Sequence, residues 1–174
     1  MGDSLITVFV IFIAVILMLL FPLLVLAENS ERITQLASQT ITAEFVDKIT
    51  TAGIMRKEDY DAFISRLHHT GSTFEVQLEV RHVDENPNRN ATIISPETSG
   101  GNLSYSVFTS SILFQMNMDG AYIFKQGDTV VVTIRNTNRT IAQLVREIFF
   151  PASGTRDYQV GASFSGMVVN NGRF

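Results

Sequence analysis

The longest apolar stretch of the chain lies near its beginning. Residues from Leu5 to Ala27 form a run of 23 positions without a charged side chain, and Thr7 alone carries a polar one. Because a helix rises about 1.5 Å per residue, this run covers the roughly 30 Å hydrocarbon core of a bilayer. The pattern therefore predicts a membrane-spanning helix.

Beyond Ala27 the polarity changes, but the helical periodicity continues. Apolar residues recur at every fourth position, flanked by Leu36 and Val46, in the row Ile33, Ala37, Ile41, Phe45 and Ile49. Between Gly2 and Gly53 there is no glycine and a single proline, Pro22. The sequence therefore predicts one helix that ends near Ala52, apolar in its first half and amphipathic in its second, with a bend or local opening at Pro22.

The remaining residues alternate between helical and strand patterns. A short helix is predicted from Lys57 to a stop at Gly71, with an apolar face of Tyr60, Phe63, Ile64 and Leu67. Residues 74–81 alternate strictly between apolar and polar, which predicts a strand with one solvated face. Residues 128–134 are rich in β-branched side chains and predict a second strand, for which the run 121–125 is the expected hairpin partner.

Three further segments complete the prediction. Residues 105–118 have an ambiguous period and are expected to form a buried element that contains Phe108, Ile112, Leu113, Phe114 and Met116. Asn138 is a predicted cap for a helix with the apolar face Ile141, Leu144, Val145 and Ile148. Residues 158–169 alternate as a strand, in which Gly161 and Gly166 allow close approach or a bulge. Residues 84–90 and 95–102 are predicted loops.

The predicted fold class is α+β. A long N-terminal hydrophobic and amphipathic α-helix, residues 1–53, precedes a small globular α+β head with antiparallel strands, residues 54–174. Residues 5–27 are the predicted transmembrane segment or filament core. A cleaved signal peptide is the alternative for this segment, but the run exceeds the usual 7–15 residues and no Lys or Arg precedes it.

Composition and motifs favour a structural protein over an enzyme. The net charge of −4 is scattered, so no basic patch indicates nucleic-acid binding, and there is no cysteine. The adjacent His68 and His69 diverge by about 100° on a helix and are poorly placed to share a metal. Asp84, Asn86 and Asn88 have the opening spacing of a calcium loop but lack its glycine and its bidentate acid. The expectation is no catalytic activity, no cofactor, no metal and no small-molecule substrate.

The uncharged run close to the N-terminus, Pro22 near its far end, the amphipathic continuation and the β-rich head together resemble type IV pilins and their pseudopilin and Tad-pilin relatives. The resemblance covers Leu5 to about Ala52 by pattern, and the rest by architecture. It implies an extracellular pilus-like filament in which the helices form the core, the proline marks a bend or a melted zone, and the heads lie outside. The implied partner is the chain itself, in a helical homopolymer that is membrane-inserted before assembly. The residues expected to make the assembly contacts are Asp3, Leu5, Phe9, Phe12, Ile16, Leu20, Pro22, Ile33, Ile41 and Phe45.

The sequence departs from the family pattern at its beginning. Only Met1 and Gly2 stand where family members carry a basic leader that ends in glycine, and Asp3 is the acid nearest to the position of the usual glutamate. Asp3 is therefore the expected partner of a neighbouring subunit's terminal amine. Two other interpretations stay open: a single-pass membrane-anchored component of a secretion or conjugation apparatus with an extracytoplasmic head, and a membrane-anchored binding or enzymatic head, which needs a pocket with converging polar groups.

Overall fold

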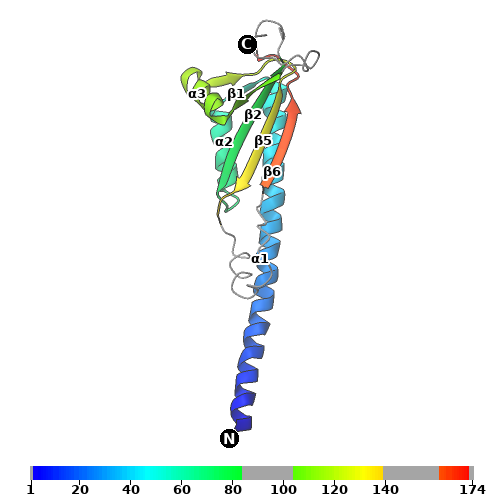
Figure 1. Ribbon diagram of the computed structural model, residues 1–174, viewed down its shortest axis with the longest axis vertical. Helices are drawn as coiled ribbons and strands as arrows, with labels where there is room; N and C mark the ends of the chain where they lie inside the picture. The colour runs from blue at the N-terminus through cyan, green and yellow to red at the C-terminus, as the bar shows by residue number, and fades with distance from the viewer. Residues whose placement is uncertain (1, 84–103, 139–160, 173–174) are drawn as a thin grey trace, which may run out of the picture.

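A long helix and a small head on its C-terminal end make up the molecule (Figure 1). The computed structural model describes residues 2–83, 104–138 and 161–172. Their elements are, in chain order, α1 (Gly2–Ala52), β1 (Ile54–Arg56), α2 (Lys57–His68), β2 (Phe74–Val83), β3 (Ser104–Phe108), α3 (Thr109–Asp119), β4 (Ala121–Ile123), β5 (Thr129–Asn136) and β6 (Gly161–Met167). The α+β class with a long N-terminal helix is confirmed.

Helix α1 is one continuous element of 51 residues that includes Pro22. It ends where Gly53 adopts a φ of 68°, the left-handed conformation that glycine tolerates best. The Gly53 N–H donates to the carbonyl of Ile49 at 2.9 Å, as in a regular helix end. The C-terminal segment supplies further donors, because Val169 N–H reaches the Thr50 carbonyl and the Asn170 amide reaches that of Thr51. The end of α1 is thus held by residues more than a hundred positions away.

The four longer strands form an antiparallel sheet in the order β3-β2-β5-β6, and β1 pairs with β4 in a separate two-stranded sheet. The expected hairpin between residues 121–125 and 128–134 is therefore wrong. Phe124 N–H donates to the carbonyl of Gly53, which holds the end of β4 beside the end of α1, where β1 begins. The turn that follows, with Gly127 at a φ of 91°, then directs the chain into the larger sheet.

The last third of α1 covers one face of the large sheet and provides much of the hydrophobic core. Phe45 stacks on Phe63 of α2, with ring centroids 4.1 Å apart and planes 7° apart. Beneath the helix lie the inward side chains of β2 and β5, which are Leu78, Val80, Val130, Val132 and Ile134. Gly166 of β6 permits the close approach of the helix, because a Cβ there would lie 3.0 Å from Val46 Cγ1 and 3.1 Å from Thr50 Cγ2.

The ambiguous segment at residues 105–118 forms strand β3 followed directly by helix α3. Ile112 and Met116 are buried as expected, but Phe108 and Phe114 are exposed. The reason is that α3 buries a single stripe with four-residue spacing, and Phe114 lies two positions from each buried residue, on the opposite side of the helix. The predicted helix after Asn138, the loops at residues 84–90 and 95–102 and the calcium-like spacing at Asp84 lie outside the described residues.

Candidate assembly surface

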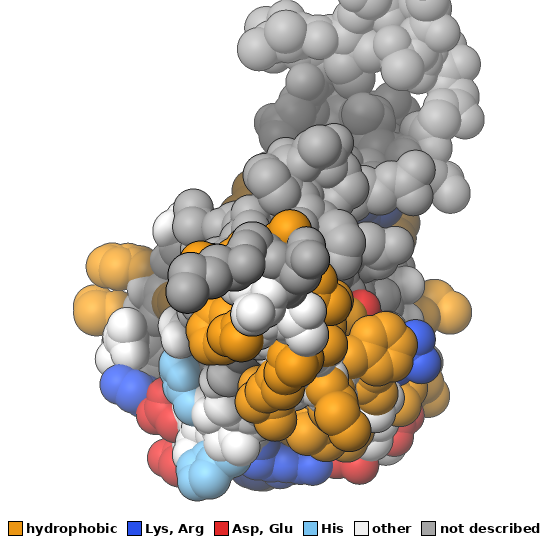
Figure 2. Space-filling model, turned by 90° about the horizontal axis from the view of Figure 1, so that it is seen from below, with side chains coloured by type: hydrophobic (Ala, Val, Ile, Leu, Met, Phe, Trp, Pro, Cys, Tyr) orange, Lys and Arg blue, Asp and Glu red, His pale blue; other side chains and the backbone are white. Residues whose placement is uncertain are grey.

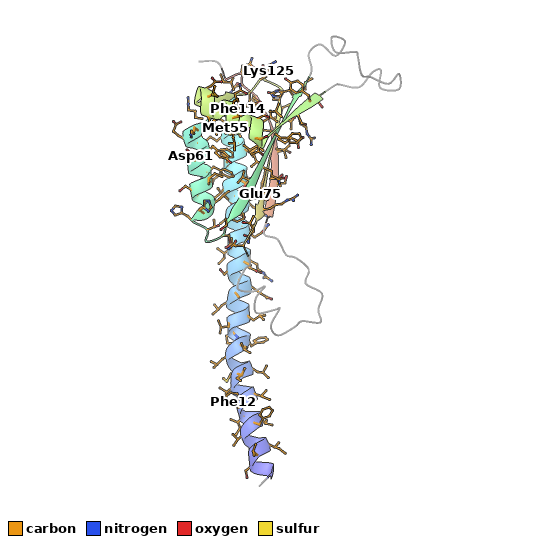
Figure 3. The ribbon with its side chains drawn as sticks, turned by 60° about the vertical axis from the view of Figure 1, so that its left-hand side comes forward. Phe12, Met55, Asp61, Glu75, Phe114 and Lys125 are labelled. Atoms are coloured by element: carbon orange, nitrogen blue, oxygen red, sulfur yellow. The ribbon has the colours of Figure 1, made fainter. Side chains whose placement is uncertain are left out.

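The N-terminal half of α1 projects from the head as an apolar rod. Its bulky side chains point outward all around the helix, as Figure 3 shows near Phe12, and almost all of them are exposed. Seen from the N-terminal end, orange apolar side chains gather near the middle of the described surface, and most of the charged side chains lie around its lower rim (Figure 2). By length and composition this helix is able to cross a membrane, and none of its most apolar window is buried by the rest of the protein.

The expected assembly residues divide into two groups. The exposed or half-exposed members on α1 are Leu5, Phe9, Phe12, Ile16, Leu20, Pro22 and Ile33. Ile41 and Phe45, by contrast, are only 9% and 5% exposed. They belong to the core of the chain's own head, so little of their side-chain surface is exposed. Asp3 lies within α1, but its side chain is outside the described part of the structure.

Pro22 lies inside α1 without ending it. Proline has no N–H, so the carbonyl of Met18, four residues earlier, lacks its usual helical donor. In water such a proline costs roughly 3 kcal/mol, whereas in a membrane neighbouring helices and local adjustments satisfy much of the loss. The proline therefore interrupts the hydrogen-bond ladder of α1 at this point.

The apolar surface of α1 does not end at the first charges. Glu28, Glu31 and Arg32 follow the apolar run, yet Ile33 and Leu36 beyond them remain 67% and 64% exposed. A shallow groove beside Ile33 runs between α1 and the end of α2; its lining is Ile33, Thr34, Ala37, Ile41, Ser65, Arg66, His69 and Thr70. Ile33 belongs to the same four-residue row as Ile41 and Phe45, but it is exposed whereas they are buried.

A buried polar network in the head joins the two sheets. His82 Nε2 lies 3.1 Å from the Tyr122 hydroxyl, and His82 Nδ1 lies 2.8 Å from Asp128 Oδ2. The second pair is close enough for an ion pair when His82 is protonated, but the Nδ1–H direction misses the oxygen, so this contact is not a well-aligned hydrogen bond. Asp128 Oδ2 also accepts the Lys125 N–H at 2.7 Å. Burial, the Asp128 carboxylate and Tyr105 raise the pKa of Tyr122 to about 12.

This network carries a structural role more readily than a chemical one. It connects β2, β4 and the turn before β5 through side chains that are almost fully buried. Among the described residues, no group of three or more His, Cys, Asp or Glu side chains is arranged to hold a metal ion. His68 and His69 are exposed at the end of α2, and His69 Nδ1 contacts the Ser65 carbonyl of its own helix.

The candidate interaction surface is therefore the exposed, largely apolar part of α1, from residue 5 to residue 36. Comparisons with protein-family models, with curated proteins and with solved structures found no match for this chain.

Proposed function

We propose that this chain is the structural subunit of an extracellular pilus-like filament, inserted in a membrane before assembly and polymerised through its N-terminal helices. One observation carries the proposal: α1 continues about 50 Å beyond the start of the head's core as a rod whose first half is apolar on every side. Only lipid or other apolar helices can cover such a rod.

The free energy of burying its apolar side chains strongly disfavours exposure of this part of α1 to water. Burying one large aliphatic or aromatic side chain gains roughly 1.5–3 kcal/mol, and the run from Leu5 to Ala27 consists almost entirely of such residues. In a bilayer the lipid tails supply this burial. Once the helix leaves the bilayer, other copies of α1 must supply it, and copies related by a repeated head-to-tail operation generate a filament.

The head is suited to the outer position in such an assembly. The last third of α1 is part of its hydrophobic core, so the head is built directly around the C-terminal end of the rod. The solvated face of the sheet carries polar side chains such as Gln77, Thr133 and Ser163. In the proposed filament the rods lie at the centre and the heads at the periphery.

Electron microscopy of the producing cells tests the proposal. We expect thin filaments that disappear when the gene is deleted and return when the full-length chain is supplied from a plasmid. A variant that starts at Glu28 keeps the part of α1 that enters the head's core; it should be a soluble monomer and should not restore filaments. Filaments formed by this variant would refute assembly through the helix.

A membrane-bound full-length chain without any filaments would instead favour the single-pass component of a secretion or conjugation apparatus. The discriminating measurement is the fraction of the chain recovered in sheared extracellular material compared with the fraction in the membrane. A filament subunit appears in both, whereas an anchored component appears only in the membrane.

A further inference from the structure

We propose that two copies of this chain pair through their α1 helices in the membrane, parallel and in register, along a seam that contains Leu26, Asn29, Ile33 and Leu36. The inference rests on the membrane insertion that forms part of the proposed function. It adds the partner's position, orientation and register, which the proposed function leaves open.

The four residues occupy one face of α1. At about 100° per residue they fall within an arc of roughly 80°, and their spacing of three, four and three residues is the a/d spacing of a coiled coil. The residues that contact the head lie on the opposite side: Gln35 bonds to Gly161, and Ser38, Thr42, Phe45 and Ile49 are buried. Asn29 and Leu36 thus lie on the side away from the chain's own described head, and Ile33 borders only the shallow groove beside α2 and stays 67% exposed, so a second helix can reach the seam.

Lipid does not cover the far end of this seam. If residues 5–27 fill the hydrocarbon core, Leu36 lies about 13 Å beyond it, whereas the headgroup layer adds only about 5–7 Å on each side. Glu28, Glu31 and Arg32 directly follow Ala27, so the first charged side chains also lie just beyond the hydrocarbon core. Ile33 and Leu36 would therefore stand in water with two thirds of their surface exposed, unless protein covers them.

The apolar seam ends at Leu36, close to the level at which the head begins. The next a and d positions after Leu36 are Thr40, Ala43 and Asp47, so the apolar character stops. In a parallel pair Asp47 would face the same carboxylate of the other copy, which is unfavourable. The head's core begins at this level on the opposite side of the helix, so two heads lie on the outside of the pair.

Two features identify the occupant as a second copy in the same orientation. Copies of a single-pass chain inserted with one topology are parallel in the bilayer. Asn29 is the only polar member of the a/d series between Leu5 and Leu36, and a carboxamide both donates and accepts hydrogen bonds. When the two helices are in register, the Asn29 side chains of the two copies lie opposite each other and can hydrogen-bond to each other. A shift by one heptad would place each Asn29 opposite an apolar side chain, which leaves its amide without a hydrogen-bond partner.

Disulfide crosslinking tests the pair directly, because the chain has no cysteine of its own. Full-length Leu36→Cys and Asn29→Cys, each produced alone, are oxidised in isolated membranes with copper phenanthroline and run on non-reducing gels. Since a disulfide needs Cβ atoms within roughly 4.5 Å, we expect at least about tenfold more dimer from each than from Arg32→Cys. Arg32 is the matched control because it is exposed at the same height, but it lies about 80° from the middle of the seam and about 40° outside its edge at Leu36.

Register is tested by producing Leu26→Cys and Ile33→Cys copies of different size together, because both copies keep Asn29. An in-register pair yields disulfides only between equal copies, and abundant Leu26-to-Ile33 disulfides would overturn the register. Equal crosslinking of Arg32→Cys and Leu36→Cys, or no Leu36→Cys dimer in membranes that contain the protein, would overturn the pair. Filaments counted in the same cells separate the two proposals: dimers without filaments refute the proposed function alone, and filaments without seam dimers refute the pair alone.

Discussion

The side-chain amide of Gln35 makes two hydrogen bonds to the backbone of Gly161, 126 residues further along the chain. Gln35 Nε2 donates to the Gly161 carbonyl at 2.7 Å, and the Gly161 N–H donates to Gln35 Oε1 at 3.2 Å. The amide thus acts as the neighbouring peptide that an edge strand lacks at this point. Because the contact lies where α1 leaves the head, it fixes the end of β6 to the base of the rod.

Replacing Gln35 with Glu tests this clamp while almost preserving the volume of the side chain. A carboxylate accepts the Gly161 N–H but cannot donate to the Gly161 carbonyl, so one bond is lost and two oxygens are brought together. We expect a loss of about 1–2 kcal/mol in the free energy of unfolding of the detergent-solubilised chain, and faster amide exchange at the start of β6. Thr40→Ala, at an exposed position one turn further on, should change neither quantity appreciably. Unchanged exchange in Gln35→Glu would show that the clamp does not hold β6.

Gly166→Ala should separate the sheet from the helix. The new methyl group would lie 3.0 Å from Val46 Cγ1 and 3.1 Å from Thr50 Cγ2, closer than carbon atoms pack. We expect a loss of about 1–3 kcal/mol in the free energy of unfolding, measured by chemical denaturation followed by circular dichroism. Ser165→Ala, on the exposed face of the same strand, is the control and should stay within about 0.5 kcal/mol of the parent. Equal effects of the two substitutions would contradict the close-approach argument.

Long periodic segments were predictable from the sequence because their local pattern agrees with their surroundings. Helix α2 and strand β2 each keep one period over most of their length, and helix α1 combines an uninterrupted apolar run with an apolar row at every fourth position; the structure contains all three. Strand β4 was assigned the wrong partner because its three residues carry too little pattern to select one. Its pairing with β1 follows from a backbone contact at Gly53, which side-chain patterns do not encode.

The candidate surface was predictable only in part, for a similar reason. A row of apolar residues on a helix shows that the row is covered, but not whether the chain's own head or another copy covers it. Ile33 and Phe45 belong to the same four-residue row, yet the structure exposes the first and buries the second. The boundary between them is set by where β6 and Gln35 meet, a contact between distant parts of the chain.

Titration of Tyr122 should make the stability of the head depend on alkaline pH. Burial, Asp128 and Tyr105 raise its pKa to about 12, above the ordinary value of about 10 for an unfolded chain. The folded state therefore binds this proton more tightly, and the resulting stabilisation is complete below about pH 10 and is lost as the pH rises through about 12. Burial and Asp61 also raise the pKa of Tyr60, so the measurement is made in a Tyr60→Phe background. There, phenolate absorbance should show a tyrosine that titrates near pH 12, which is lost in Tyr122→Phe and kept in Tyr105→Phe. A titration near pH 12 that survives in Tyr122→Phe would contradict the assignment.

The last prediction concerns Asp3 and follows from the proposed filament. When the rods pack against one another, Asp3 enters apolar surroundings, where an isolated carboxylate is costly and requires a cationic partner from an adjacent subunit. Asp3→Ala removes this interaction without shortening the apolar run, so the variant should reach the membrane at the parent's level but yield far fewer filaments. Ser4→Ala, at the neighbouring position, is the matched control and should assemble normally. Membrane fractions and sheared filaments are quantified from the same cultures, and filament yields equal to the parent's in Asp3→Ala would remove Asp3 from the assembly mechanism while leaving the packing of the helices untouched.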